Sequence, residues 1–199
     1  IKNEIFAGYI LNLLANGKKF TYKKSRLGNS ISDKAAINVF KHHTKNLIVD
    51  EFIPEGADER QFCSPGFNLP IGVISRSSYY NFREYHTSLD NLSKFNFKIF
   101  FESVEKILDI LETIEINSKP KSTVVYGTHH FSRRGSKLYE TTFYKRKKSQ
   151  RTKILLKILN LSDGKLDFID IANKNNFSLL DYKDLIKEII KEKLVKVKK

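Results

Sequence analysis

The feature that most constrains the fold is an alternation of short apolar runs with longer segments in which apolar residues recur every three or four positions. Phe6–Leu14 (FAGYILNLL) is a continuous apolar run, typical of a strand buried on both faces of a sheet. Phe97–Ile114 carries apolar residues at helical spacing and predicts the clearest helix of the chain. Strands that alternate with such helices predict an α/β sandwich with a mainly parallel sheet. The further predicted elements are a helix at Ser32–His43 and strands at Leu47–Phe52 and Leu69–Ile74.

The expected helix starts follow from residues whose side chains cap helices. Ser32 is a suitable N-cap for the first helix, and Asp90 or Ser93 is expected to cap the helix that begins near Phe97. Gly56–Asn68 is rich in Gly, Ser, Pro and charged residues and is therefore expected to be a loop.

After residue 151 the pattern changes to three short helices followed by one strand, an order typical of a winged helix-turn-helix. Phe168, Ile171, Leu185, Ile189 and Leu194 are available for its small core. The predicted helices are Thr152–Leu161, Asp167–Asn173 and Leu180–Lys193, and the strand is Leu194–Lys198.

The distribution of charge also divides the chain into two parts, with the boundary near residue 118. Residues 1–118 contain 15 Lys and Arg against 14 Asp and Glu, whereas residues 119–199 contain 21 against 8, a net charge of +13. Residues 119–150 combine dense positive charge with weak periodicity, so we interpret them as a basic linker. The predicted domains are therefore an α/β domain over 1–118, the linker over 119–150 and a winged helix over 151–199. Only the basic part is expected to attract polyanions.

Cysteine usage and hydropathy bear on the compartment. Cys63 is the one cysteine, so no internal disulfide can form and a reducing compartment fits best; we expect Cys63 to be a small buried residue rather than a nucleophile. No apolar run reaches the roughly 18 residues of a membrane span, and residues 1–18 do not resemble a signal peptide. We therefore expect a cytoplasmic protein with no membrane partner. The chain starts at Ile1 and has no methionine, so we also expect it to be N-terminally incomplete.

Gly56–Leu92 is the most informative stretch for function. One loop presents Asp58, Glu59 and Arg60, a strand follows, and a second loop delivers Tyr85-His86-Thr87 before the long helix. Loops at strand ends are where α/β sheets place ligands, because the sheet fixes the loop roots and leaves the tips open. A neutral imidazole in such a loop can bind a metal ion through one ring nitrogen.

These residues resemble the di-zinc aminopeptidase-like family, in a bacterial branch with a fused C-terminal winged helix that is associated with polysaccharide-biosynthesis clusters. The chain looks like the C-terminal half of such a protein. The segments that carry the resemblance are YKKSRLGN (Tyr22–Asn29), DERQFCSPGFNLP (Asp58–Pro70), EYHTSLDNL (Glu84–Leu92), Arg134-Gly135 with Leu138-Tyr139, and LNLSDG (Leu159–Gly164).

The resemblance implies roles for five residues. His86 matches the last zinc ligand of the family, and Asp58 matches the Asp of the family's Asp-His loop, either as a ligand or as the support of one. Glu59, Arg60 and Tyr85 are expected to contact substrate. A solvated charged loop is the alternative for Asp58, Glu59 and Arg60, an Arg60–Glu59 pair is equally open, and the alternative for Tyr85 is simple packing. The chain departs from the family at Ala57 and Glu59, where many relatives have serine and histidine.

The family's other zinc ligands and its general base come earlier in its sequence and are not found here. His42 and His43 are adjacent on a helix, so their side chains point in different directions and cannot share one metal ion. The resemblance therefore implies two zinc ions in the complete protein, no catalytic residue in this chain, and no activity of this chain alone.

Two classes of function remain. The first is a zinc-dependent aminopeptidase-like hydrolase that acts on a peptide or a small amide. The second is a non-catalytic binding or regulatory protein that works through its winged helix on a nucleic acid or protein partner. The third predicted helix of that domain interleaves lysines with acidic residues, so we expect any nucleic-acid binding to be weak and non-specific. A homo-oligomer is left open.

Overall fold

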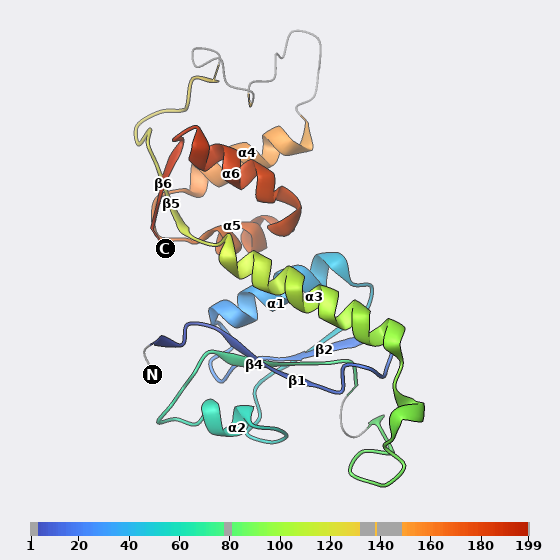
Figure 1. Ribbon diagram of the computed structural model, residues 1–199. Helices are drawn as coiled ribbons and strands as arrows, with labels where there is room; N and C mark the ends of the chain where they lie inside the picture. Colours follow the sequence, from blue (N-terminus) through green and yellow to red (C-terminus); the bar gives the residue numbers. More distant parts are fainter. Residues whose placement is uncertain (1–3, 78–80, 132–137, 139–148, 199) are drawn as a thin grey trace. The chain divides into compact units, whose positions relative to one another are not determined.

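The computed structural model describes residues 4–77, 81–131, 138 and 149–198. It comprises two compact units, residues 1–114 and 115–199 (Figure 1). The first unit is a mixed α/β structure with a largely parallel sheet, and the second is a winged helix. The predicted fold class is confirmed.

The sheet of the first unit has four strands in the order β1-β4-β2-β3. β1 (Gly8–Asn12) runs parallel to β4 (Ile71–Ser75), and β2 (Phe20–Lys23) runs parallel to β3 (Leu47–Asp50). The two parallel pairs meet where β2 and β4 pair antiparallel. Their carboxyl ends therefore lie at opposite ends of the sheet, which we name the β1/β4 end and the β2/β3 end.

β1 differs from its prediction. It was expected to be buried on both faces, but it is an outer strand of the described sheet and its residues are at most half-buried; Leu11 is 49% exposed. A continuous apolar run indicates burial in the complete fold and does not by itself distinguish a central strand from an outer one.

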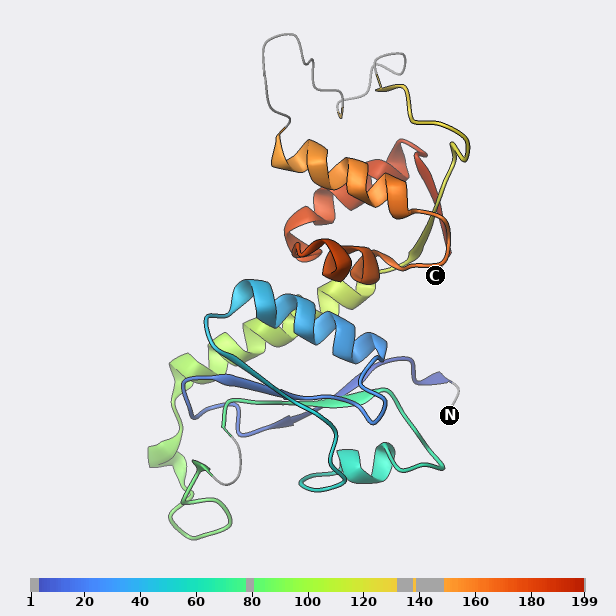
Figure 2. The same ribbon diagram turned by 180° about the vertical axis from the view of Figure 1, so that it is seen from behind.

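Helices α1 (Ile31–His43) and α3 (Phe97–Glu115) cover one face of the sheet, and α2 (Glu59–Phe62) lies on the other (Figures 1 and 2). Phe20 of β2 and Phe40 of α1 stack with ring centroids 4.7 Å apart, and both are buried. This contact places the core of the unit between α1 and the middle of the sheet.

The N-cap of α1 is Ser30, not Ser32. The Ser30 side chain accepts a hydrogen bond from the backbone N–H of Asp33, and the Asp33 carboxylate accepts one from the backbone N–H of Ser30. Ser32 is buried instead: its hydroxyl donates to the carbonyl of Pro70 at 2.6 Å and accepts from the N–H of Gly8 at 3.0 Å. The helix start is thereby fixed to the beginnings of β1 and β4.

The start and the apolar surface of α3 also depart from expectation. Asn96, rather than Asp90 or Ser93, accepts a hydrogen bond from the N–H of Ile99 at the start of the helix. Ile114 of the predicted apolar stripe is buried, as is Ile110, which the predicted stripe did not include, but several other members of the stripe are exposed. The exposed members are Phe97 (68%), Phe101 (65%), Leu108 (59%) and Leu111 (48%).

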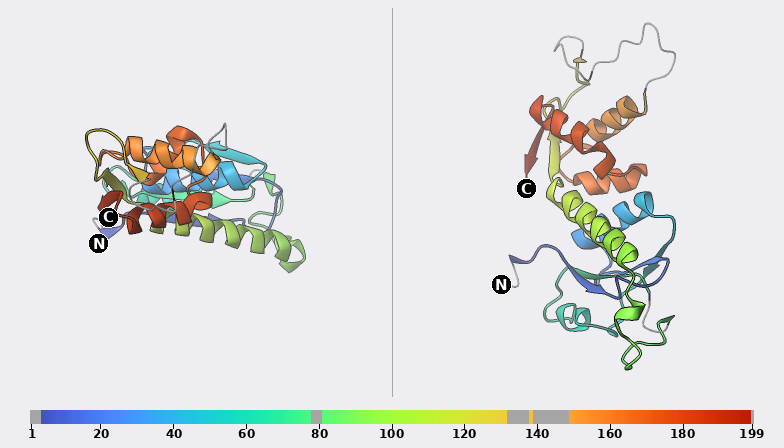
Figure 3. Two further views of the ribbon diagram at one scale, coloured as in Figure 1. Left: turned by 90° about the horizontal axis from the view of Figure 1, so that it is seen from above. Right: turned by 45° about the vertical axis from the view of Figure 1, so that its right-hand side comes forward.

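The second unit contains α4 (Gln150–Leu161), α5 (Phe168–Asn175) and α6 (Lys183–Lys191), with a short 3-10 turn, Leu180–Tyr182, before α6. Its strands β5 (Lys119–Ser122) and β6 (Val195–Lys198) pair antiparallel (Figure 3). The five predicted core residues Phe168, Ile171, Leu185, Ile189 and Leu194 are all buried.

The predicted linker of residues 119–150 is wrong for its first part. β5 is a strand of the winged helix, and the N–H of Thr123 donates to the carbonyl of Leu194. Periodicity did not reveal β5 because its sequence, KPKS, holds no strong strand former. Residues 132–137 and 139–148, with Arg134, Gly135 and Tyr139 of the family resemblance, lie outside the described residues.

Over the part of the chain that the structure describes, no helix is both long and apolar enough to cross a bilayer.

Candidate metal and substrate residues

The β2/β3 end of the sheet holds a buried ion pair. Lys23, the last residue of β2, donates to the carboxylate of Glu59, the first residue of α2. The Lys23 ammonium also donates to the carbonyl oxygen of Glu55 at 2.5 Å and to that of Ile53 at 3.4 Å. The Glu59 side chain is fully buried, that of Lys23 is 15% exposed, and the second carboxylate oxygen of Glu59 has no hydrogen-bond partner among the described residues. The pair ties α2 to the sheet.

This burial corrects the reading of Glu59 as a member of an open loop. Residues 59–62 are helical, and the first helical turn points Glu59 inward while Asp58 and Arg60 stay exposed. Glu59 pairs with Lys23 and not with Arg60. As a buried, paired residue it is closed to a substrate in this structure. The Asp58 and Arg60 side chains form no hydrogen bond or ion pair among the described residues, so their predicted roles remain predictions.

Asp33 forms a second buried polar cluster beside this pair. Its carboxylate accepts hydrogen bonds from the Tyr22 hydroxyl at 2.8 Å, from the N–H of Ser25 at 2.7 Å, and from Ser30. Burial raises the pKa of Tyr22 well above its usual value of 10.0, and the neighbouring Asp33 carboxylate raises it further. Tyr22 is therefore a neutral hydrogen-bond donor at physiological pH.

Two of the segments that carry the family resemblance meet here. The Cys63 thiol is buried and lies 3.2 Å from the carbonyl oxygen of Ile71, and the Arg26 guanidinium donates to the Asn68 side chain at 2.9 Å. Burial raises the pKa of the Cys63 thiol, and the Glu59 carboxylate adds to the rise. A buried thiol with a raised pKa is a poor nucleophile, as expected. The segments Tyr22–Asn29 and Asp58–Pro70 thus fold as one polar cluster.

The third segment lies at the other end of the sheet. His86 follows β4, so its loop starts from the β1/β4 end, as the green segment before α3 shows in Figure 1. The His86 side chain is exposed and stacks on the ring of Tyr85, with centroids 4.0 Å apart. Its backbone has φ of 59°, a left-handed conformation that non-glycine residues rarely adopt. Such conformations cluster at functional sites.

The structure does not bring the two predicted zinc ligands together. Asp58 directly precedes α2, which the Glu59–Lys23 pair ties to the β2/β3 end, whereas the loop that carries His86 starts from the β1/β4 end. Catalytic zinc sites use three protein ligands and an open position. No group of three His, Cys, Asp or Glu side chains that could hold a metal ion occurs among the described residues. These residues therefore do not fit a zinc ion by themselves, and a bound zinc would need ligands beyond the described residues.

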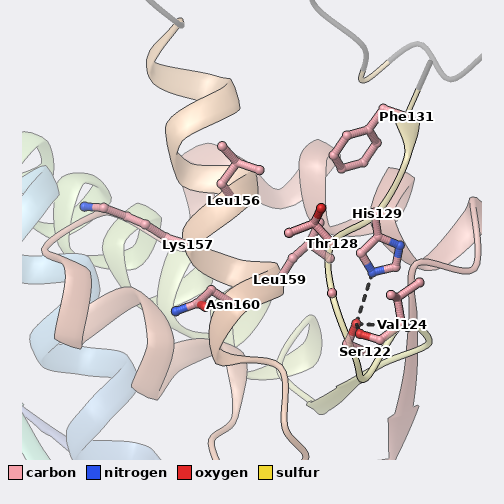
Figure 4. Close-up of a pocket in the computed structure, with 10 residues that line it drawn as sticks. Ser122, Val124, Thr128, His129, Phe131, Leu156, Lys157, Leu159 and Asn160 are labelled. Atoms are coloured by element: carbon pink, nitrogen blue, oxygen red, sulfur yellow. Dashed lines mark hydrogen bonds between the residues drawn. The ribbon is translucent and has the colours of Figure 1, made fainter.

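The second unit contains a separate pocket of about 690 Å³ between α4 and residues 122–131 (Figure 4). Ser122 Oγ and His129 Nε2 are 3.0 Å apart there, which resembles a nucleophile and its base. However, the Ser122 hydroxyl donates its proton to the carbonyl of Val124 at 2.9 Å. The Ser122 hydroxyl is therefore part of the local hydrogen bonds that support the turn after β5, which include one from the N–H of Val124 at 3.2 Å.

Sequence reasoning missed Lys23 and Asp33. Lys23 lies in a run of lysines, and nothing in the sequence marks one of them as buried. Asp33 lies within the predicted helix Ser32–His43, and nothing in that prediction shows that it accepts hydrogen bonds from a buried tyrosine and a loop. A partial signal exists for Asp33: the sequence Ser30-x-x-Asp33 is a capping pattern.

Comparison with known proteins gives the following relationships. Residues 1–117 match a family described as a domain of unknown function, DUF4910, and residues 118–197 match a winged helix-turn-helix family. The chain is 31% identical over 204 aligned positions to a Clostridium acetobutylicum protein described as a candidate polysaccharide biosynthesis protein with an aminopeptidase-like domain. It also resembles the crystal structure of a candidate peptidase from Clostridium acetobutylicum, with 29% identity and a TM-score of 0.85.

Both alignments cover 99% of this chain, but they cover only 44% and 43% of the two relatives. The chain therefore spans less than half the length of the proteins that it matches.

Proposed function

The chain belongs to the DUF4910 family. From its similarity to a protein with an aminopeptidase-like domain and to the structure of a candidate peptidase, we propose that the complete protein is a zinc-dependent hydrolase of aminopeptidase type, acting on peptides or small amides. The similarity to a protein with an aminopeptidase-like domain extends over 99% of the chain, so it includes both the α/β unit and the winged helix. In this proposal the present chain is not an active enzyme by itself, because its described residues do not form a metal site.

The observation that carries the proposal is the geometry of His86. An exposed imidazole on a left-handed residue stands in a loop that follows the carboxyl end of a strand with a parallel neighbour. This is the position in which α/β sheets bind ligands, and imidazole is a preferred zinc ligand. Tyr85 stacks on the ring and limits its orientation. We therefore propose that His86 is a zinc ligand that this chain supplies, and that Tyr85 is a substrate contact. Arg60 lies beside Asp58 at the β2/β3 end, so its proposed substrate contact requires the same convergence with the His86 loop as Asp58 does.

Asp58 is the second candidate ligand. The resemblance places it beside zinc, whereas the sheet places it at the end opposite to the start of the His86 loop. Asp58→Ala in the complete protein distinguishes these positions. Loss of zinc would mean that the His86 loop and Asp58 converge in the complete protein, whereas retention of zinc would leave His86 as the ligand from this chain.

Hydrolysis of aminoacyl p-nitroanilides by the complete protein tests the function. We expect His86→Ala to lower kcat/KM by at least about 100-fold, because loss of the partners that merely support metal ligands already costs 10–100-fold. His130→Ala is the matched control, since His130 is an exposed histidine of the second unit and should leave the rate unchanged. An unaltered rate in His86→Ala, or a rate that survives exhaustive treatment with a chelator, would refute the proposal.

A further inference from the structure

One face of the β5–β6 pair consists entirely of lysines. The register pairs Lys119 with Lys198 and Lys121 with Lys196. Residues directly opposite in an antiparallel pair share a face, and so do residues two apart in one strand. The four lysines therefore project from one face, and all four are exposed. We name this set the lysine ladder: Lys119, Lys121, Lys196 and Lys198.

The opposite face of the same two strands explains why the ladder faces solvent. Pro120 and Val195 lie on that face and are buried. The small core of the winged helix thus fixes the orientation of both strands, because a shift by one residue would exchange the two faces.

The ladder is electrostatically unfavourable in the isolated fold. Like charges placed directly opposite on neighbouring strands repel, and here two such pairs follow one another. None of the four lysines forms an ion pair within the described chain. The nearby Asp163 contacts its own neighbour Lys165, with a side-chain separation of 4.0 Å. Four unpaired like charges held on one face of the strand pair by the backbone indicate a surface built to meet a polyanion.

Helix α6, where a winged helix usually reads DNA, is much less positive. It carries Lys183, Lys187 and Lys191 against Asp184 and Glu188, and Glu188 forms an ion pair with Arg151 at 2.9 Å. Compared with α6, the two strands therefore carry positive charge without acidic neighbours. Lysine is a point charge without the paired donors that recognise bases, so such a surface suits phosphates of any sequence.

We infer that the lysine ladder is a binding surface for the phosphate backbone of duplex nucleic acid, and that α6 contributes little to this contact. Duplex DNA presents one negative charge per roughly 1.7 Å of its axis, and lysines that neutralise phosphates release condensed counterions. The interaction is therefore independent of sequence and strongly dependent on salt. It does not depend on the proposed hydrolase activity, because it uses the second unit alone.

The test is fluorescence anisotropy of a labelled 20-base-pair duplex with the 199-residue chain, over a salt range from about 50 to 200 mM. In the ladder variant all four lysines are replaced (K119Q, K121Q, K196Q, K198Q). Each phosphate contact contributes about 0.9 to the magnitude of the slope of log K against log salt, so the loss of four contacts should make the slope shallower by about 3.6. A matched variant, K157Q, K174Q, K187Q and K191Q, removes the same charge from exposed positions on α4, α5 and α6, and its slope should fall by less than about 1.

Thermal unfolding shows whether each variant is folded, and the ladder variant should melt no lower than the parent chain because repulsion has been removed. Equal losses of slope in the two variants would show that overall charge matters and not the ladder, which would overturn the inference. The inference also fails if the ladder variant keeps the parent slope, or if it loses binding to phosphatidylserine vesicles while DNA binding is unchanged.

Discussion

The Lys23–Glu59 pair gives a quantitative prediction because the two partners differ in exposure. Lys23→Met would leave the Glu59 carboxylate fully buried with neither oxygen paired, since the second oxygen already has no partner among the described residues. Breaking a buried ion pair from one side costs about 3–5 kcal/mol, and we expect Lys23→Met to fall in this range. Glu59→Gln leaves Lys23 with two carbonyl acceptors and 15% exposure, so its cost should be only about 1–3 kcal/mol.

Urea unfolding followed by circular dichroism measures these free energies. The double variant Lys23→Met/Glu59→Gln should be destabilised by less than the sum of the single variants, by at least about 1 kcal/mol, because it no longer buries an unpaired charge. The neighbouring pair Lys24–Glu51 is the control: Glu51 is 77% exposed, so Glu51→Gln should cost less than about 1 kcal/mol. Additive single effects, or a Glu59→Gln cost above that of Lys23→Met, would refute the assignment of a buried, coupled pair.

Two further predictions concern the first unit. Tyr22→Phe removes a buried donor to Asp33 and should cost about 1.5–3 kcal/mol at pH 7. Because the pKa of Tyr22 is raised in the folded state, its contribution to the free energy of unfolding is complete below the unfolded pKa of about 10 and is lost as pH rises beyond it. The difference in unfolding free energy between wild type and Tyr22→Phe should therefore narrow above pH 10 in urea titrations. A difference that widens would contradict the burial of Tyr22. On α3, Ile110→Ala should cost about 2–5 kcal/mol and Phe101→Ser less than about 1 kcal/mol in this chain, and equal costs would show that the exposed stripe is packed.

Local patterns predicted the fold class because each element follows from the spacing of its own apolar residues. The three helices and the core of the winged helix were found in this way, since Phe168, Ile171, Leu185 and Ile189 repeat at helical spacing. Hydrophobic periodicity did not predict β5, whose sequence is KPKS. This segment is a strand because it pairs with β6, because Pro120 is buried, and because the N–H of Ser122 donates to the carbonyl of Ser162 at the end of α4. Tertiary pairing of this kind leaves no local signal.

The site was less predictable than the fold. The motif around Asp58 drew attention to a segment that contacts Tyr22–Asn29, but it did not show that Glu59 turns inward to Lys23. That orientation depends on four helical residues within a segment whose composition indicates a loop. The relative positions of Asp58 and His86 depend on the antiparallel pairing of β2 with β4, a contact between strands that are far apart in sequence. Neither feature can be derived from residue spacing.

The zinc content of the complete protein tests the central proposal most directly. Elemental analysis by plasma mass spectrometry, after dialysis against metal-free buffer, should find zinc in the wild type and in the His130→Ala control. It should find less than about a tenth of that content in folded His86→Ala, since loss of groups that only support metal ligands already lowers metal affinity 10–100-fold. Wild-type zinc content in His86→Ala, or no zinc in the wild type under conditions in which it hydrolyses aminoacyl amides, would contradict the assignment of His86 as a zinc ligand.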